Sequence, residues 1–165
     1  MRVFGNIIWG AATLGLSACG MREWFVTSDP VEVVEVARSQ LCSAEQPEAR
    51  IRVFESPAAV AGWQQLTGID LRTGPLAQGH YALIEMGQHH TGGYGIAISR
   101  EARIRDDVLQ IYATFFSPSA RGVVTQVITS PCVLVRLPGG YYREVEVYDQ
   151  DGALRASSPS GSVAS

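Results

Sequence analysis

The sequence has 165 residues, of which 46% are apolar and 18% are charged, and its formal net charge is −3. This length fits one domain with short tails, and the apolar fraction is large enough for a hydrophobic core, which excludes a broadly disordered chain. The small net charge offers no broad basic surface to a phosphate backbone, so we expect no nucleic-acid partner.

The start of the chain has the pattern of an export signal. Arg2 precedes an apolar run from Ile7 to Leu16 that is too short to span a bilayer comfortably. Small residues then lead into Cys19, an arrangement that resembles the bacterial lipoprotein signal. The resemblance implies cleavage before Cys19 and acylation of that residue, for example with palmitate. Two or more acyl chains would hold the protein stably on a membrane. An ordinary secretory signal is the alternative.

The organisation of the chain follows from this signal. We expect a signal peptide over residues 1–18, a tether over 19–30, one β-rich domain over 31–150 and a disordered tail over 151–165, which is rich in Ser, Ala and Gly. Gly20, and not aspartate, follows the lipidated cysteine, which by resemblance to enterobacterial sorting indicates the outer membrane. The predicted location is therefore the bacterial cell envelope, as an outer-membrane lipoprotein facing the periplasm or the surface.

Apolar patterning predicts a series of strands. Period-two alternation is typical of half-buried strands, and short apolar runs are typical of strands buried on both faces. The alternation is clearest between Leu109 and Phe115, where every second residue is apolar and points to the expected core. The expected strands are residues 31–36, 51–54, 81–86, 94–103, 107–117, 123–128, 132–137 and 142–149.

One helix is predicted between Ser56 and Gly68. Ser56 is a suitable N-cap, the following proline suits the first helical position, and Gly68 can end the helix. Four side chains share one face at helical spacing and are expected to pack on the sheet: Ala59, Val60, Trp63 and Leu66. We expect Trp63 to be a core residue and not a platform for a ligand.

The central feature of the prediction is a hairpin between Tyr81–Met86 and the strand that starts at Tyr94. Thr91-Gly92-Gly93 can supply the positive φ angles that a tight reversal needs, and Asp106-Asp107 makes the next reversal. Since the strands follow one another through short turns, we predict an α+β fold. It would be mainly an antiparallel β meander or curved sheet with one packed helix.

Several short motifs follow one another between Trp63 and Pro138. They are the helical Trp63, the strand Tyr81–Met86 ending in Gly87, the turn Thr91-Gly92-Gly93-Tyr94, Pro118, Thr129-Ser130-Pro131 and the apolar Val133-Leu134-Val135. In this order they resemble the C-terminal domain of the PrcB family, named for a lipoprotein subunit of a protease complex. The resemblance implies a small β-rich domain on an exported lipoprotein that stabilises or assembles a partner protein such as a protease. It implies no catalytic residue.

Cys42 and Cys132 are the two cysteines that remain after lipidation of Cys19. An exported chain with an even number of remaining cysteines favours a disulfide, and two free thiols are the alternative. The bridge would close a loop of about 90 residues and contribute about 4 kcal/mol in the chain-entropy account.

Other groupings give weak support for catalysis or a bound metal. His89 and His90 are adjacent and would point to opposite faces of a strand, while His80 lies at the far end of the expected hairpin, so we expect no metal site. Ser117-Pro118-Ser119 lacks the glycines of a nucleophile elbow, and Asp106-Asp107 fits a turn. We therefore expect no enzyme and no cofactor.

The leading functional hypothesis is a lipid-anchored accessory protein of the cell envelope that binds or stabilises a partner protein, such as a subunit of a protease complex. The alternative is a domain that binds a small ligand or cell-wall material on a concave aromatic surface. Its tyrosines would be Tyr94, Tyr112, Tyr141 and Tyr142. A hydrolase is a third and weaker hypothesis, because it would need a histidine, a nucleophile and an acid in one cleft.

Overall fold

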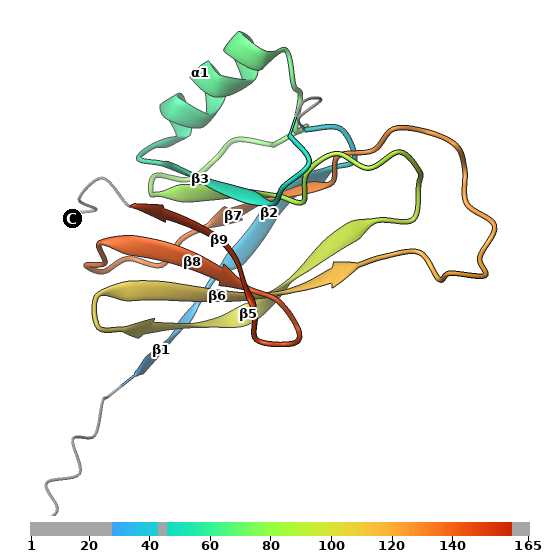
Figure 1. Ribbon diagram of the computed structural model, residues 1–165. Coiled ribbons are helices and arrows are strands. Elements are labelled where there is room, and N and C mark those ends of the chain that lie inside the picture. The colour runs from blue at the N-terminus through green and yellow to red at the C-terminus, as the bar shows by residue number, and fades with distance from the viewer. Residues whose placement is uncertain (1–27, 43–45, 160–165) are drawn as a thin grey trace, which may run out of the picture.

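The computed structural model describes residues 28–42 and 46–159, which form two β-sheets packed face to face with a helix on the outer side of one of them (Figure 1). The predicted signal peptide and the lipidation site Cys19 lie outside the described residues. Within the described part of the chain, no helix is long and apolar enough to cross a membrane.

The described elements are nine strands and one helix. They are β1 (Asp29–Glu32), β2 (Val34–Ser39), β3 (Arg50–Phe54), α1 (Pro57–Thr67), β4 (Tyr81–Glu85), β5 (Gly95–Arg105), β6 (Val108–Phe116), β7 (Cys132–Arg136), β8 (Glu144–Tyr148) and β9 (Leu154–Pro159).

The strands divide into a five-stranded sheet with the order β1-β5-β6-β8-β9 and a four-stranded sheet with the order β2-β7-β4-β3. Neighbouring strands are antiparallel, apart from the parallel pair β6 and β8. The predicted α+β class, with mainly antiparallel strands and one packed helix, is confirmed. The connectivity differs from a meander, because successive strands are distributed over two sheets.

The predicted hairpin between Tyr81–Met86 and the strand from Tyr94 is wrong. β4 pairs with β3 on one edge and β7 on the other, whereas β5 pairs with β1 and β6 in the other sheet. Since both edges of β4 already carry partner strands, no edge is left for β5. The segment with Thr91-Gly92-Gly93 therefore connects the two sheets.

The first predicted strand, residues 31–36, is two strands in different sheets. Val33 lies between them, is almost fully buried, and donates its backbone N–H to the carbonyl of Arg100 at 2.9 Å. β1 pairs with β5 and β2 pairs with β7, so the chain passes from one sheet to the other at this valine. The alternation of valine and glutamate is interrupted at Val33-Val34, and this interruption falls at the junction.

Two expectations near the C-terminal half also need correction. Residues 123–128, expected to be a strand, have no strand structure, and most of their side chains are exposed. Conversely, Leu154–Pro159 was expected to belong to a disordered tail but forms β9, which pairs antiparallel with β8. The remaining residues 160–165 lie outside the described part of the chain.

Two hydrophobic cores result from this layering. The first lies between the sheets and contains the inward faces of β5, β6 and β8, including the predicted Leu109, Ile111 and Val145. The second lies between the four-stranded sheet and α1 and contains Trp63 and Leu83. β4 and β7 contribute to both cores, which explains why their sequences are almost continuously apolar.

Helix α1 has the predicted caps. The Ser56 hydroxyl accepts a hydrogen bond from the N–H of Ala59 at 3.2 Å, Pro57 occupies the first turn, and Gly68 ends the helix in the left-handed conformation. Val60 and Trp63 are buried, with Trp63 against Phe54 of β3 at a ring-centroid distance of 5.9 Å. The expectation that Ala59 and Leu66 pack on the sheet is wrong, because both residues are exposed.

Candidate functional site

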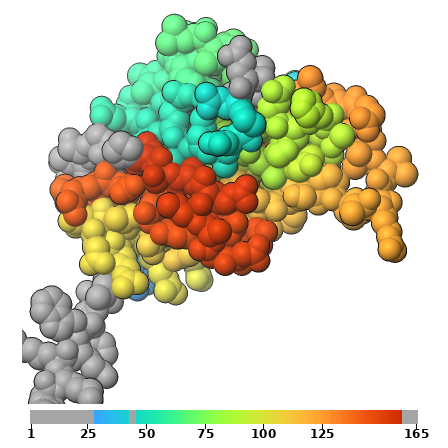
Figure 2. Space-filling model, in the orientation of Figure 1, coloured from blue at the N-terminus to red at the C-terminus, as the bar shows by residue number. Residues whose placement is uncertain are grey.

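Some of the predicted family motifs lie together in one projecting part of the molecule. The turn Thr91-Gly92-Gly93-Tyr94 lies against the segment 117–130, and we call these two stretches, residues 87–94 and 117–130, the arm. Gly92 donates its N–H to the carbonyl of Thr125 at 2.9 Å, and the Thr129 hydroxyl donates to the carbonyl of Thr91 at 2.9 Å. The orange atoms of Figure 2 show the outer part of the arm projecting from the body.

The two glycines of the turn are required by close contacts across the arm. A Cβ at Gly92 would come within 2.4 Å of the Thr125 hydroxyl oxygen. Gly93 has a φ of +92°, and a Cβ there would lie 3.0 Å from the Cβ of Pro118. Thr91, Gly92, Gly93 and Pro118 are therefore parts of one packed unit, although the sequence separates them.

The histidine pair lies at the start of the arm. His89 exchanges two backbone hydrogen bonds with Thr129, at 2.8 and 2.9 Å, and its ring stacks on Tyr94 with the centroids 3.7 Å apart. Burial lowers the pKa of His89, and the charges of Arg155 and His90 add to this effect. His89 therefore has a structural role, namely the attachment of one half of the arm to the other. Among the described residues, no group of three or more His, Cys, Asp and Glu side chains is placed to hold a metal ion.

The base of the arm is joined to the rest of the chain by the disulfide between Cys42 and Cys132. This bridge, predicted from the cysteine count, is present, with the two Cα atoms 5.9 Å apart. Just before it, Leu41 forms a parallel bridge with Ser130, and the N–H of Cys42 donates to the Ser130 carbonyl at 3.0 Å. The bridge therefore fixes the segment around Leu41 beside the base of the arm.

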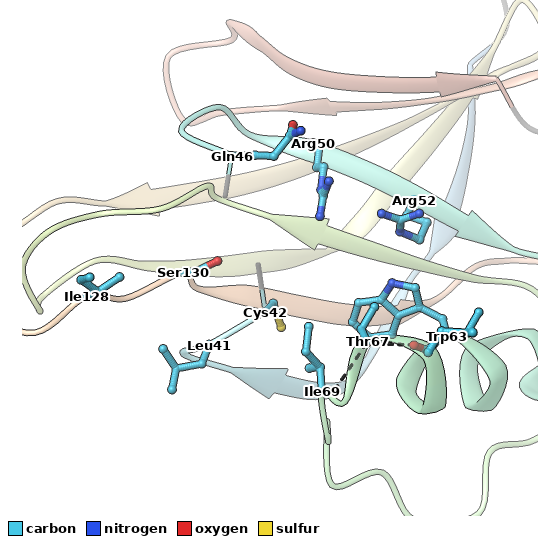
Figure 3. Close-up of a pocket in the computed structure, with 11 residues that line it drawn as sticks. Leu41, Cys42, Gln46, Arg50, Arg52, Trp63, Thr67, Ile69, Ile128 and Ser130 are labelled. Carbon is cyan, nitrogen blue, oxygen red and sulfur yellow. Dashed lines mark hydrogen bonds between the residues drawn. The ribbon is translucent and has the colours of Figure 1, made fainter. Parts of the chain in front are cut away.

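A groove of about 700 Å³ opens between this base, strand β3 and the end of α1 (Figure 3). Its floor is the part of the helix-facing side of the four-stranded sheet that α1 leaves uncovered. The described residues that line it are Leu41, Cys42, Gln46, Arg50, Arg52, Trp63, Leu66, Thr67, Ile69, Ile128 and Ser130.

Alternation along β3 explains the charge on the floor of the groove. Ile51 and Val53 point into the core between the sheets, so Arg50 and Arg52 point to the helix side, as Figure 3 shows. Arg50 lies directly opposite Glu85 of β4, and its Nε and a terminal nitrogen contact the two carboxylate oxygens at 2.5 and 2.9 Å. This hydrogen bonding raises the pKa of Arg50 further.

Arg50 and Glu85 therefore form a two-point ion pair in which the Glu85 side chain is 1% exposed and that of Arg50 is 31% exposed. Arg52 differs, because it makes no hydrogen bond or ion pair with any described residue, and its Nε is buried without a partner. The described floor consequently carries one cation whose charge is not balanced.

The rim of the groove is apolar and exposed. Leu66 on α1 is 89% exposed, Leu41 is 64% exposed and Ile128 on the arm is 51% exposed. Exposed aliphatic side chains that face one another across a groove are typical of a binding surface. No His, Asp or Glu is among the described residues that line the groove, so these residues form no acid–base pair there.

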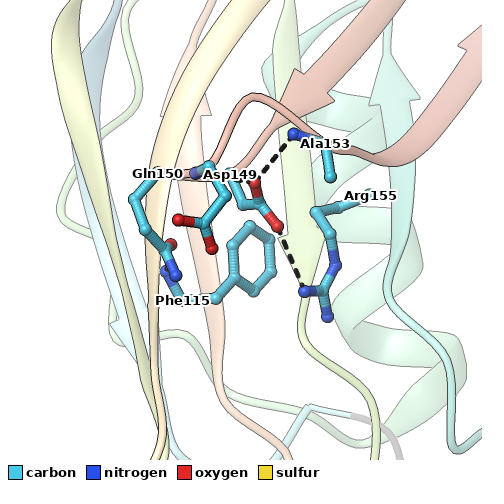
Figure 4. Close-up of polar contacts among 6 residues, drawn as sticks. Phe115, Asp149, Gln150, Ala153 and Arg155 are labelled. Carbon is cyan, nitrogen blue, oxygen red and sulfur yellow. Dashed lines mark hydrogen bonds and ion pairs between the residues drawn. The ribbon is translucent and has the colours of Figure 1, made fainter.

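A second cluster of charged and aromatic groups lies at the β8–β9 turn (Figure 4). The Asp149 carboxylate accepts hydrogen bonds from the N–H groups of Asp151 and Ala153, both at 2.9 Å, and pairs with Arg155 at 3.4 Å. The Arg155 guanidinium lies 4.7 Å from the centre of the Phe115 ring. We call Phe115, Asp149 and Arg155 the turn cluster; it holds β9 in the sheet.

The predicted aromatic surface is not present. Tyr142 is fully buried between the sheets, where burial raises its pKa to about 12. Tyr94 stacks in the arm, Tyr112 lies beside Tyr148 on the outer face of the five-stranded sheet, and Tyr141 is exposed in the loop before β8. These four tyrosines therefore do not line one concavity.

The disulfide and the motif Thr91-Gly92-Gly93-Tyr94 were predictable from the sequence, whereas the arm and the groove were not. Two features of the sequence could have indicated the charged floor of the groove. Arg50 and Arg52 alternate with two β-branched residues, and Glu85 is the single charged residue in an apolar run. They were insufficient because the position of α1 over only part of the sheet was not predictable from periodicity.

The fold and the groove define a two-sheet β domain that has a projecting arm and a preformed binding surface at its base. Comparison with known proteins adds the family: residues 80–138 match the family model described as PrcB C-terminal. This segment is therefore similar to a PrcB C-terminal domain. It contains β4 to β7 and the whole arm, that is, strands of both sheets. No curated protein and no solved structure matches the chain.

Proposed function

We propose that the protein is a lipid-anchored accessory protein of the cell envelope that binds a partner protein, a component of a protease complex, through the groove and the adjacent arm. The observation that carries the proposal is the groove itself, a preformed hollow with an exposed aliphatic rim and a cationic floor. The PrcB C-terminal match supports the association with a protease complex, and the lipoprotein-like start of the chain supports the location.

The arm gives this surface a rigid edge. Ile128 belongs to both the arm and the rim, and the outer arm adds Val123 and Val127, which are also exposed. Paired backbone hydrogen bonds and the disulfide fix the base of the arm. Binding would therefore cost little conformational entropy there. Such a preorganised surface suits an assembly role, in which the domain acts by binding and not by catalysis.

The proposal is tested by comparing partners of the full-length protein extracted from membranes in mild detergent. Leu66→Glu places a charge on the rim, while Leu154→Glu makes the same change at an exposed leucine of β9, which is 51% exposed and outside the groove. We expect quantitative mass spectrometry to show a partner, a protease subunit, that is retained by wild type and by Leu154→Glu and lost from Leu66→Glu. Equal recovery by the two variants would contradict the assignment to the groove.

The anchor has its own test, the intact mass of the membrane-extracted protein. We expect a mass equal to residues 19–165 plus acyl groups. An unprocessed and unacylated mass would remove the lipid anchor from the proposal and leave the groove assignment standing.

A further inference from the structure

Among the residues that the structure describes, no carboxylate balances the charge of Arg52 on the floor of the groove. Arg50 and Glu85 neutralise each other through two short contacts, whereas Arg52 has no partner among the described residues and its Nε is buried. A partly desolvated guanidinium is unfavourable unless an anion pairs with it. The most direct source of that anion is a bound ligand, because the guanidinium of Arg52 borders the open volume of the groove (Figure 3).

The surroundings of Arg52 indicate the kind of anion. The fork of a guanidinium matches a carboxylate, and here a single cation beside a neutral ion pair offers one net positive charge. A phosphate group carries more negative charge and is usually bound by several cations or by a row of backbone N–H groups. The floor therefore favours a carboxylate over a phosphate, and a single acidic side chain over an acidic run.

The walls of the groove indicate which groups of the ligand flank this carboxylate. Trp63 and Leu66 of α1 form one wall, and Leu41 and Ile128 form the other, so apolar surface lies on both sides of the floor. A chain that crosses the groove with an acidic side chain on Arg52 would place its neighbouring residues against these walls. The arrangement fits an internal acidic residue with apolar residues before and after it.

We propose that the groove binds an extended segment of the partner protein in which one Asp or Glu, flanked by apolar residues, pairs with Arg52. This inference rests on the proposed function, because it specifies what the partner presents to the same groove. Arg52 supplies the polar contact that sets the register of the segment. The exposed Leu41, Leu66 and Ile128 supply the apolar contacts that contribute most of the buried area.

The probe is a phage-displayed library of random twelve-residue peptides, selected on the full-length protein in detergent. We expect enrichment of peptides with one acidic residue between aliphatic or aromatic residues. Representative peptides are then synthesised with an acetylated amino terminus, an amidated carboxyl terminus and a fluorescent label, each in a Glu and a Gln version. Fluorescence anisotropy measures the dissociation constant of each version for wild-type protein and for Arg52→Gln.

The pairing predicts a coupled loss of affinity. Replacing Glu by Gln in the peptide, or Arg52 by Gln in the protein, should each weaken binding about tenfold, and both changes together should weaken it little more than one. Arg100→Gln is the matched control, because Arg100 is an exposed arginine of the other sheet that pairs with Glu32. It should leave the affinity unchanged. The Glu-to-Gln peptide pair needs no protein variant, so the test stands even if Arg52→Gln folds poorly.

Several results would overturn the inference. Enriched peptides without an acidic residue, equal affinity of the Glu and Gln peptides, or binding that requires a free carboxyl terminus would each exclude an internal carboxylate on Arg52. Arg52-dependent binding to phosphatidylglycerol vesicles, without peptide binding, would assign the groove to a lipid surface. If the cellular partner is lost from Leu66→Glu but the peptide experiment fails, the proposed function stands and this inference alone is wrong.

Discussion

The groove floor and the turn cluster are built from the same chemical groups but differ in how completely those groups are satisfied. Each has a well-buried carboxylate, an arginine that pairs with it and an aromatic ring: Glu85, Arg50 and Trp63 in the groove, and Asp149, Arg155 and Phe115 at the turn. At the turn, the carboxylate also accepts two backbone N–H groups, and the arginine covers a ring.

Among the described residues at the groove floor, Arg50 is paired with Glu85, whereas Arg52 has no carboxylate partner. Arg52 stands next to a complete ion pair, with its Nε buried and unpartnered, beside an open volume and an apolar rim. A charged cluster in this fold is structural when its charges and hydrogen-bonding groups pair with one another. It is a candidate for binding when one group is left over at a cavity. Four predictions test this distinction.

Removal of the disulfide should have the largest effect and should act on the groove. Replacing both Cys42 and Cys132 by serine frees a loop with a sequence separation of 90 residues. We expect a loss of about 4 kcal/mol in the free energy of unfolding, measured by urea denaturation. Hydrogen exchange should rise around Leu41 and the base of the arm, while amides of the β8–β9 turn keep their protection. Uniform loss of protection would contradict the separation of the two regions.

Breaking the ion pair of the groove floor should come next. Glu85→Gln removes the buried carboxylate that Arg50 contacts at two points, and we expect a loss of about 3 kcal/mol in the free energy of unfolding, because the two-point ion pair is broken. Glu35→Gln is the matched control, since Glu35 pairs with Arg38 in an exposed position and should change stability by less than about 1 kcal/mol. Equal effects in thermal or urea unfolding would show that Glu85 is not paired as described.

Replacing a glycine of the arm and a glycine of helix α1 by alanine should change the stability of the protein in opposite directions. Gly93→Ala places a Cβ against Pro118 at a positive φ, so we expect destabilisation by about 1–2 kcal/mol. Gly62→Ala lies in α1 with nothing within 4 Å of the new Cβ, and it should stabilise by about 0.5–1 kcal/mol. Melting temperatures that shift in the same direction would contradict the packing of the arm.

The turn cluster should give the smallest effect, visible as a pH dependence. Hydrogen bonds from the Ala153 and Asp151 amides, together with Arg155, lower the pKa of Asp149 below its ordinary value of 3.8. The contribution of Asp149 to stability is therefore complete above the unfolded-state pKa and is lost as the pH falls through the folded-state pKa. We expect Asp149→Asn to lower the melting temperature at pH 7, and the difference from wild type to shrink below about pH 4. A constant difference across this range would contradict the role of the carboxylate.

The parts of the fold that depend on local chemistry were predictable from the sequence. The capped helix follows from Ser56, Pro57 and Gly68, and the buried faces of β6 and β8 follow from strict alternation. The assignment of strands to sheets was not predictable in this way. A strand pattern specifies which faces are buried but does not specify which edges pair, so the chain's change of sheet at Val33 and the separation of β4 from β5 were missed.

The candidate site, too, was only partly predictable from the sequence. Thr91-Gly92-Gly93-Tyr94 and Cys42–Cys132 were recognised as local or countable features, and the structure brings both to one region. The groove depends on a helix that covers only part of a sheet and on the base of the arm, where Ile128 and Ser130 border the groove. Leu66 shows what helical spacing cannot predict. Its spacing predicts burial, but the helix extends past its contact with the sheet, so Leu66 is exposed on the rim of the groove.

The most direct test of the central claim is site-specific photocrosslinking of the full-length protein in living cells. A photoreactive amino acid is placed in turn at Leu66, at Ile128 and, as the control, at Leu154, all of which are at least 50% exposed. The account predicts that one envelope protein, a protease-complex component, is captured from the positions of Leu66 and Ile128 and not from that of Leu154. Capture of the same protein at Leu154 alone, or its copurification without any crosslink from the groove positions, would contradict the assignment of partner binding to the groove.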